Sequence, residues 1–240
     1  LLMLLAAAIW GFGFIAQKEA MDAIGPLTFN AVRFGIGALA VAPLRFFIPR
    51  IHHGDGPADR RRERRLLIRG SVLLGLVVAA ASALQQWGIV GTEAGPAGFI
   101  TGLYVEFTPI IGMLVGVRTN LATWIGCGLA AIGMWFLGIK EGSGGFSIDL
   151  PAMLVLGGAV GWAIQVQIVA RYSPHTDPID LTVIQFSVVA VTTMIAAIII
   201  EGPGQALDMV EIFRSATWGI LYSGVLAIGV AFFLQIVAQR

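Results

Sequence analysis

Charged residues and cysteine are both scarce in this chain. Only 12% of its 240 residues are charged, about half the share of roughly 25% that is usual in soluble domains. The single cysteine, Cys127, excludes a disulfide framework. The formal net charge is only +1, so no basic excess indicates a nucleic-acid partner. These absences argue against a soluble domain, a disulfide-rich domain and a nucleic-acid-binding protein.

Sequence motifs for catalysis and metal binding are also missing. No HExxH, GxSxG, Walker A or GxGxxG segment occurs in a setting that supports it. The three histidines, His52, His53 and His175, fall in predicted loops and do not share a helix face at metal-ligand spacing. We therefore predict that the protein is not an enzyme and that it has no cofactor and no metal site.

Long hydrophobic runs are the dominant feature of the chain. Hydrophobic residues make up 57% of it, and its mean hydropathy is +0.86. Several apolar runs reach about 18 residues or more, which as a helix crosses about 30 Å of hydrocarbon. The sequence predicts an all-α, polytopic membrane helical bundle. Eight spans are expected, at residues 1–17, 26–48, 70–90, 96–117, 120–139, 150–171, 179–200 and 217–238.

Basic residues are distributed unevenly between the two sides of this topology, eleven against three. Because Lys and Arg concentrate in cytoplasmic loops, the N-terminus and the long basic loop are predicted to be cytoplasmic. The arginine run at 60–65 is explained by this topology and by attraction to anionic membrane lipid; a specific partner site is the alternative. The eleven are the eight arginines of segment 45–69 with Arg118, Arg171 and Arg240, and the three are Lys18, Lys140 and Arg214.

Glu106 is the one acidic residue that falls deep in a predicted span. A carboxylate at the bilayer centre costs about 2.5–3.5 kcal/mol on insertion scales, so it indicates a functional site. Three roles are open: a proton-coupling carboxylate, a ligand for a cationic group of a substrate, or a structural partner of Arg33. Pro109, three residues further on, lacks a backbone donor and permits a kink.

Other candidates for a solute path are aromatic and polar residues inside the predicted spans. Trp10 and Trp162 lie near the middle of their spans, where anchoring at the membrane interface does not explain them. They either line a cavity or pack between helices. Arg33 either faces a cavity or extends to the outer headgroups. The remaining candidates, for which interhelical hydrogen bonding is the alternative to substrate contact, are Gln86, Tyr104 and Gln165.

Matches at a nearly constant offset indicate an internal repeat. A shift of 152 residues aligns Trp10 with Trp162 and Phe34 with Phe186, and a shift of 150 aligns Gln85 with Gln235. The first repeat, residues 1–140, holds five spans. Because five is odd, the second repeat, residues 141–240, enters the membrane from the opposite side, as in the inverted repeats of secondary transporters. It holds only spans six to eight, so we expect two further spans and ten in the complete protein.

Glycine pairs at GxxxG spacing occur in three spans. They are Gly98/Gly102, Gly112/Gly116 and Gly157/Gly161. Small residues at this spacing let helix backbones approach closely in a membrane. The sequence therefore predicts close helix–helix contacts at these positions.

The opening segment LLAAAIWGFGFIAQKEAM, followed by PLTFNAVRFGIGALA, resembles the EamA-type members of the drug/metabolite transporter superfamily. The Thr108–Pro109 pair resembles part of that family's fourth helix, and WAIQVQIVARYS at 162–173 resembles the start of its second unit. The resemblance covers essentially the whole chain. It implies a ten-helix carrier of the inner membrane, often an exporter of amino acids, metabolites or drugs. One departure is the turn Gly116–Val117–Arg118, where the family often has Glu in the middle.

These observations predict a secondary transporter, an exporter of small metabolites, amino acids or drugs that works by alternating access. Its midplane cavity is expected between spans one, three, four, six and eight. Candidate partners are a small-molecule substrate, protons, membrane lipid and a second copy of the chain in a homodimer. The alternative, from another functional class, is a membrane scaffold or subunit that does not transport.

Overall fold

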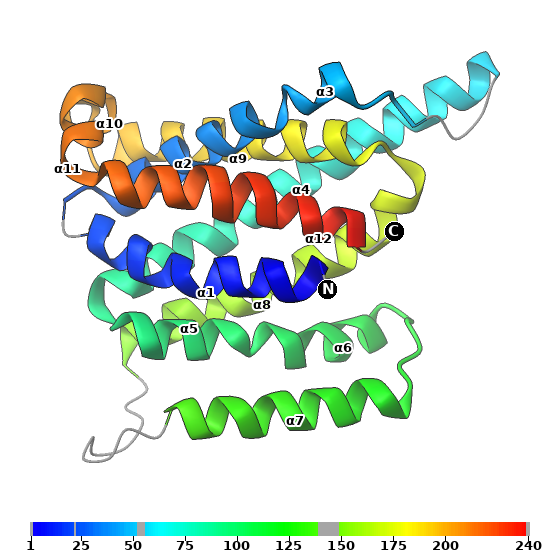
Figure 1. The fold of residues 1–240 in the computed structure, drawn as a ribbon, viewed down its shortest axis with the longest axis horizontal. Coiled ribbons are helices and arrows are strands. Elements are labelled where there is room, and N and C mark those ends of the chain that lie inside the picture. Colours follow the sequence, from blue (N-terminus) through cyan, green and yellow to red (C-terminus); the bar gives the residue numbers. More distant parts are fainter. Residues whose placement is uncertain (1, 22, 52–55, 139–148, 239–240) are drawn as a thin grey trace.

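The computed structural model describes residues 2–21, 23–51, 56–138 and 149–238, and every regular element within them is helical (Figure 1). The first half contains α1 (Leu2–Met21), α2 (Pro26–Val41), α3 (Leu44–Phe47), α4 (Pro57–Gly91), α5 (Ala94–Gly102), α6 (Tyr104–Leu114) and α7 (Leu121–Gly138). The second half contains α8 (Leu150–Tyr172), the short 3-10 helix η1 (Ser173–His175), α9 (Pro178–Ile200), α10 (Pro203–Leu207), α11 (Met209–Leu221), the π-helix η2 (Tyr222–Ala231) and α12 (Phe232–Ala238).

Seven helical segments among the described residues are long and apolar enough to cross a membrane. They coincide with seven of the eight predicted spans, and the remaining one, 120–139, coincides with the apolar helix α7. The prediction of an all-α, polytopic membrane bundle is confirmed. The predicted boundary between the two repeats, at 140 and 141, lies outside the described residues.

Helix starts follow local sequence signals. Pro26 and Pro178 occupy the first turns of α2 and α9, where a missing backbone donor costs nothing. The side chains of Asp149 and Asp208 accept hydrogen bonds from the third residue after them, at the starts of α8 and α11. These caps define where the membrane helices begin.

The prediction that the basic segment between the second and third spans is a loop is wrong in part. The arginine run at 60–65 lies within α4, which begins at Pro57 and extends 35 residues. Pro57 is favourable at a first helical position, and Asp59 complements the positive end of the helix dipole. Arginine is itself a good helix former, so α4 continues well beyond the apolar segment.

The predicted span 96–117 is interrupted, but not at Pro109, where the sequence permits a kink. The break falls at Leu103, between α5 and α6, while Pro109 lies inside α6. Because Pro109 has no N–H, the carbonyl of Val105 lacks its helical partner. Sγ of Cys127 on α7 lies 3.8 Å from that oxygen and donates a weak hydrogen bond to it. The free carbonyl therefore joins α6 to α7.

The centre of the bundle is an aromatic and aliphatic core where α2 lies against α9 and α4 against α8 (Figure 1). Phe34 and Phe186 on α2 and α9 are fully buried and lie 5.6 Å apart between ring centroids. Val78 on α4 and Phe232 on α12 belong to the same cluster. These contacts bring together segments that the 152-residue shift pairs in sequence.

Close contact between α4 and α8 depends on glycines. A Cβ at Gly158 would lie 3.0 Å from the carbonyl oxygen of Ala81, and one at Gly161 would lie 2.6 Å from Cβ of Ala81. The predicted role of the Gly112/Gly116 pair is wrong for Gly116. Gly116 follows α6 with a φ of +85° and has no atom within 4 Å of a Cβ position, so it serves the turn.

The last span differs from the predicted range 217–238 at its start and in its internal geometry. It begins at Met209 and includes the ten-residue π-helix η2. π-helical turns are rare and frequently occur at functional sites.

Candidate functional site

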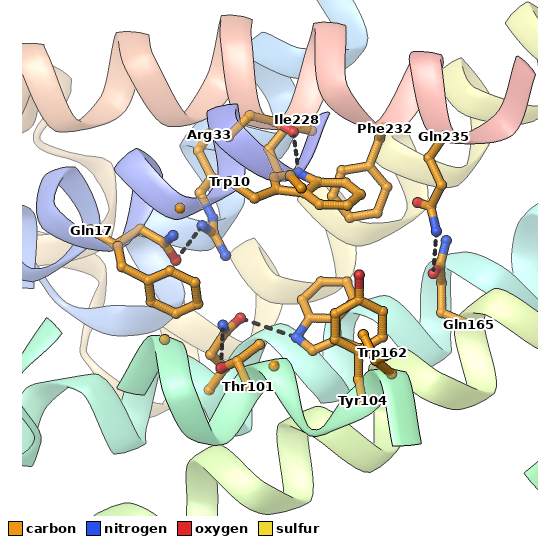
Figure 2. Close-up of a pocket in the computed structure, with 18 residues that line it drawn as sticks. Trp10, Gln17, Arg33, Thr101, Tyr104, Trp162, Gln165, Ile228, Phe232 and Gln235 are labelled. Atoms are coloured by element: carbon orange, nitrogen blue, oxygen red, sulfur yellow. Dashed lines mark hydrogen bonds between the residues drawn. The ribbon is translucent and has the colours of Figure 1, made fainter. Parts of the chain in front are cut away.

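A cavity of about 330 Å³ lies between the helices of the bundle (Figure 2). Its lining residues come from α1, α2, α4, α5, α6, α8, η2 and α12. All five spans from which a cavity was predicted contribute to it, and α2 contributes in addition. Five of the seven candidate residues line this cavity: Trp10, Arg33, Tyr104, Trp162 and Gln165.

The middle of the cavity has an aromatic wall built around Phe232. Its ring centroid lies 5.2 Å from that of Trp10 and 5.8 Å from that of Trp162. Both contacts are edge or tilted arrangements, which aromatic rings prefer to flat stacking. Nε1 of Trp10 donates to the carbonyl oxygen of Ala227 at 2.9 Å. The aromatic wall is therefore held in one arrangement by both ring contacts and a hydrogen bond.

A short polar relay holds the second tryptophan. Nε1 of Trp162 donates to Oε1 of Gln85 at 3.2 Å, and Nε2 of Gln85 donates to Oγ1 of Thr101 at 3.1 Å. Gln85 and Thr101 are both buried and both line the cavity. These two hydrogen bonds connect α8, α4 and α5, so the position of Trp162 depends on the contact between α4 and α8.

Arg33 lies at one end of the cavity, beside Gln17 (Figure 2), and is only 3% exposed. Its Nε donates to Oδ1 of Asn30 at 2.9 Å, and its Nη1 donates to Oε1 of Gln17 at 2.8 Å. The amide orientation that satisfies Gln86 places its oxygen 3.2 Å from both Nη1 and Nη2. The guanidinium also lies over the ring of Phe29, 5.0 Å from its centroid. Arg33 is thus inside the bundle, and the alternative that it extends to the headgroups is wrong.

Gln165 and Gln235 lie at the opposite end of the cavity, with Trp10, Trp162 and Phe232 between them and Arg33 (Figure 2). Nε2 of Gln235 is 3.4 Å from Oε1 of Gln165. Nε2 of Gln165 and Oε1 of Gln235 are buried and have no partner among the described residues. This end of the cavity therefore offers one unused donor and one unused acceptor.

Glu106 and Gln86, the other two candidates, are not lining residues of this cavity. Glu106 lies in the first turn of α6, and both of its carboxylate oxygens are buried with no hydrogen-bond partner in the described part of the chain. The ion pair with Arg33, one of its three predicted roles, is not formed between these described residues. Gln86 supports the cavity indirectly, through the hydrogen bonds that its amide oxygen accepts from Arg33.

Five cavity residues to which the structure gives a role, Gln17, Gln85, Thr101, Phe232 and Gln235, were not among the predicted candidates. Gln17 is seven residues after Trp10, a spacing that places both on one face of α1. Phe232 precedes Gln235 by three residues on α12, again on one face. Helical spacing from the predicted candidate Trp10 therefore identifies Gln17, and spacing from Gln235, which the repeat pairs with Gln85, identifies Phe232.

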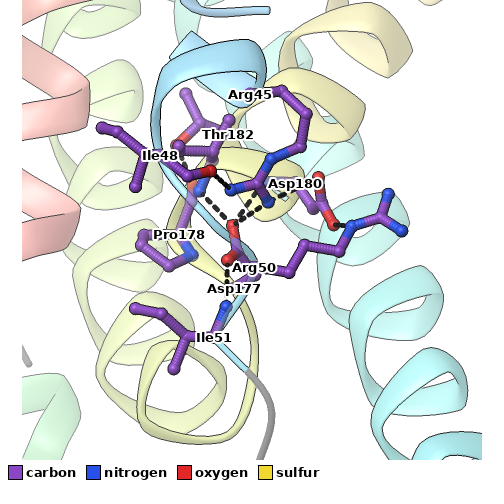
Figure 3. Close-up of polar contacts among 9 residues, drawn as sticks. Arg45, Ile48, Arg50, Ile51, Asp177, Pro178, Asp180 and Thr182 are labelled. Carbon is purple, nitrogen blue, oxygen red and sulfur yellow. Dashed lines mark hydrogen bonds and ion pairs between the residues drawn. The ribbon is translucent and has the colours of Figure 1, made fainter.

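Ion pairs join α3, which directly follows α2, to the start of α9 (Figure 3). Arg45 lies 3.2 Å from Asp177 and 3.5 Å from Asp180, and Asp180 also pairs with Arg50 at 3.0 Å. The carboxylate of Asp177 accepts from the backbone N–H of Ile51 at 2.9 Å. Burial alone raises the pKa of Asp177, but its bonds to Ile51, Asp180 and Arg45 together hold that pKa below its usual value.

A second carboxylate joins the opposite ends of the same two helices. Glu201, just after α9, accepts hydrogen bonds from the backbone N–H groups of Leu27 and Thr28 at 2.7 and 2.9 Å, and from the Thr28 hydroxyl at 2.7 Å. These donors belong to the first turn of α2, where the helix dipole favours an anion. Helices α2 and α9 are therefore antiparallel and joined at both ends.

Sequence comparison identifies a family and several relatives. Residues 1–139 match the sequence model of the EamA-like transporter family. An uncharacterized transporter of Archaeoglobus fulgidus is 31% identical over 175 residues, which is 72% of this chain and 49% of the relative. The uncharacterized transporter YoaV of Bacillus subtilis is 25% identical over 229 residues, or 93% of this chain and 73% of YoaV. The chain thus spans about half the length of the first relative.

Two further matches agree with this picture. The uncharacterized transporter YvbV of Bacillus subtilis is 26% identical over 207 residues, covering 82% of this chain and 61% of YvbV. A protein crystal structure matches the fold with a TM-score of 0.69 over the whole chain and 78% of that protein, at 16% sequence identity. At this identity the match shows a shared fold.

Proposed function

The chain belongs to the EamA-like transporter family, and from this we propose that it is a secondary transporter that exports a small molecule by alternating access. Family membership and the seven long apolar helices make it a multi-pass membrane protein of a transporter family. The observation that carries the finer proposal is the cavity itself. It joins buried polar groups to an aromatic wall and is lined from both halves of the chain, as a midplane substrate site between repeats requires.

We further propose that residues 1–140 and 141–240 form two inverted repeats. Phe34 and Phe186, which occupy equivalent positions, contact each other, and Trp10 and Trp162 both contact Phe232. Helices α2 and α9 are antiparallel, as the equivalent helices of inverted repeats are. These contacts support the repeat.

The proposed location is the inner (plasma) membrane with the N-terminus in the cytoplasm. The arginine run at the start of α4 and Arg118 in the α6–α7 connection lie at one end of the bundle, and Lys18 at the end of α1 lies at the other (Figure 1). This distribution supports the orientation through the positive-inside rule. Lys140 and Arg240, which entered the count, lie outside the described residues, as do His52 and His53. The homodimer and the lipid contact of the arginine run stay predictions.

Glu106 is proposed to carry the coupled proton, separately from the substrate cavity. Its buried carboxylate oxygens have no partner among the described residues, and an ionised carboxylate in such surroundings is costly. A proton bound there in one conformation and released in another supplies the coupling that a carrier without a nucleotide site needs. The test is uptake under a pH gradient by Glu106→Gln, which should still exchange substrate but no longer concentrate it.

The experiment for transport is counterflow in proteoliposomes that contain the full-length protein. Vesicles loaded with unlabelled amino acids and organic acids are diluted into the labelled mixture, because exchange needs no net proton movement. Trp10→Ala should reduce exchange at least about tenfold, since it removes part of the aromatic wall. The matched control is Trp124→Ala on α7, outside the cavity, which should exchange like the wild type. No exchange by the wild type with either class of solute supports the scaffold alternative instead.

A further inference from the structure

We infer, resting on the proposed transport function, that the substrate is a small organic anion whose acidic group binds Arg33. Its apolar body lies against Trp10, Trp162 and Phe232. Its far end reaches the Gln165–Gln235 pair.

The charge of the cavity is the first argument. Among the described residues that line it, Arg33 is the only one with a charged side chain. No carboxylate in the described part of the chain lies within ion-pair distance of it, and its protein partners Asn30, Gln17 and Gln86 are neutral. A buried charge is stabilised by an opposite charge and strongly disfavoured without one. An anionic ligand provides that opposite charge.

The geometry of the guanidinium is the second argument. Arginine has five N–H donors in a planar fork that matches carboxylate and phosphate oxygens. The bonds to Asn30 and Gln17 use one donor each, and Gln86 accepts from two more at 3.2 Å. At least one N–H, on Nη2, remains for a ligand in the cavity. A charge-assisted hydrogen bond from that group is stronger than one to a neutral acceptor.

The lack of acidic lining argues against a cation. A primary amine would bring a second positive charge into the cavity with Arg33. Glu106, the one carboxylate among the candidates, lies outside the lining. A zwitterion brings both charges, so its ammonium group is left without an anionic partner. The cavity should therefore prefer an anion without an amino group.

The aromatic wall and the volume define the rest of the ligand. The indole N–H groups of Trp10 and Trp162 are already bonded to Ala227 and Gln85, so the rings offer apolar surface. At about 30 Å³ for each water, 330 Å³ holds roughly eleven waters. This is room for a ligand of roughly ten to fifteen non-hydrogen atoms. A six-membered ring with a short acidic side chain has this size.

The far end adds a preference for one neutral polar group. Gln165 and Gln235 are 1% and 2% exposed, and each has one amide atom without a partner among the described residues. A hydroxyl or amide on the ligand both accepts from Nε2 of Gln165 and donates to Oε1 of Gln235. A hydroxyl opposite the acidic group should therefore strengthen binding.

The test compares four ligands of one shape on the wild-type protein in detergent. They are 3-phenylpropionate (an anion), 3-phenylpropionamide (neutral), phenylalanine (a zwitterion) and phenethylamine (a cation). Binding is measured by quenching of intrinsic tryptophan fluorescence, because the ligand lies against Trp10 and Trp162. The expected result is that 3-phenylpropionate binds about 10- to 100-fold more tightly than the amide, the range for hydrogen bonds to a charged group. Equal or tighter binding of the amide or the amine overturns the inference.

Two variants assign the charge. Arg33→Gln should reduce 3-phenylpropionate affinity to that of the amide. The matched control is Lys18→Gln, which removes a cation on α1 that does not line the cavity and should leave the preference unchanged. Unchanged affinity in Arg33→Gln overturns the inference. If Arg33→Gln does not fold, the four wild-type affinities decide it alone.

Counterflow separates this inference from the proposed transport function. Exchange of 3-phenylpropionate with no exchange of phenethylamine supports both. Exchange of phenethylamine with none of 3-phenylpropionate leaves transport standing and overturns the anion preference. Selective binding of 3-phenylpropionate with no exchange of any ligand supports the anion site and contradicts transport.

Discussion

A methyl group added at Gly88 should separate α4 from α8. A Cβ there would lie 2.5 Å from Cγ2 of Val155 and 2.6 Å from the carbonyl oxygen of Pro151. The backbone N of Val155 would be only 2.9 Å away. Two of these three atoms are backbone and cannot rotate aside, so Gly88→Ala forces α8 to move.

The loss of stability in Gly88→Ala is measured against the same substitution at a glycine that has free space around it. Overpacking of this kind costs about 1–3 kcal/mol, while replacing glycine by alanine in a helix gains about 1 kcal/mol in propensity. Gly126 on α7 has no atom within 4 Å of a Cβ position, so Gly126→Ala reports the propensity gain alone. Relative to this control, Gly88→Ala should be less stable by about 1–3 kcal/mol, or about 2–12 °C in Tm for a chain of this length.

The same shift should reach the cavity. Trp162 on α8 donates to Gln85 on α4 across 3.2 Å, so moving α8 lengthens this bond and displaces part of the aromatic wall. The assays are thermal unfolding in detergent, followed by tryptophan fluorescence, and counterflow in proteoliposomes. If Gly88→Ala matches Gly126→Ala in Tm and in exchange, the contact between α4 and α8 is not limited by Gly88 and this reasoning is refuted.

The ends of α2 and α9 give two further predictions. Glu201→Ala removes three hydrogen-bond acceptor contacts at the start of α2 and should lower stability by about 1–2 kcal/mol; an equal Tm loss in the exposed control Glu211→Ala would contradict this. The lowered pKa of Asp177 means that folding favours its ionised form. The stability that this carboxylate adds to the folded state is complete above the unfolded pKa of about 3.9. It is lost as the pH falls through the folded pKa. Asp177→Asn should therefore flatten the fall of Tm below about pH 4, and an unchanged acid profile would show that the bonds of Asp177 to Ile51, Asp180 and Arg45 do not contribute to stability.

Much of the fold could be predicted because hydropathy, proline and loop charge act locally. Pro26 and Pro178 lie at the starts of α2 and α9, within one residue of the predicted span starts at 26 and 179, and the apolar runs define the spans. The start of α4 could not be predicted from apolar length, because the arginine-rich segment is stabilised as helix outside the hydrocarbon. The break at Leu103 was not predicted either, because the sequence pointed to Pro109, which instead lies inside α6 where Cys127 bonds to the carbonyl that the proline leaves free.

The candidate site could be predicted in part for a physical reason. A charged residue in the middle of a span is costly in lipid, which identified Arg33. A tryptophan there is not explained by anchoring at the membrane interface, which identified Trp10 and Trp162. The cost of a charge in lipid also selected Glu106, which lies outside the cavity. Burial cost shows that a residue needs a special environment, but it does not show which face of the helix that environment occupies. Only the packed structure separates these cases.

The joined ends of α2 and α9 indicate which helices move together during transport. Hydrogen bonds to Glu201 and ion pairs to Asp177 fix both ends of this helix pair. By contrast, α1 and η2 belong to different proposed repeats, lie side by side and both line the cavity. A pair of cysteines at each of two helix contacts can test this. Between α2 and α9, a Cβ at Gly35 would lie 3.8 Å from Cβ of Ala190. Between α1 and η2, a Cβ at Gly13 would lie 3.8 Å from Cβ of Ala227. Both separations match the usual Cβ distance of a disulfide, about 3.8 Å.

In a Cys127→Ala background, the pair Gly35→Cys and Ala190→Cys should therefore oxidise and keep counterflow near the uncrosslinked rate. The pair Gly13→Cys and Ala227→Cys should oxidise equally well and block it, with recovery on reduction. The two cysteine pairs have the same Cβ–Cβ separation, so a difference in transport between them reports helix motion and not disulfide strain. If the α2–α9 disulfide stops exchange as completely as the α1–η2 one, the two joined helices slide past each other during the cycle. Their end contacts must then break in every turnover, and Glu201→Ala should speed exchange.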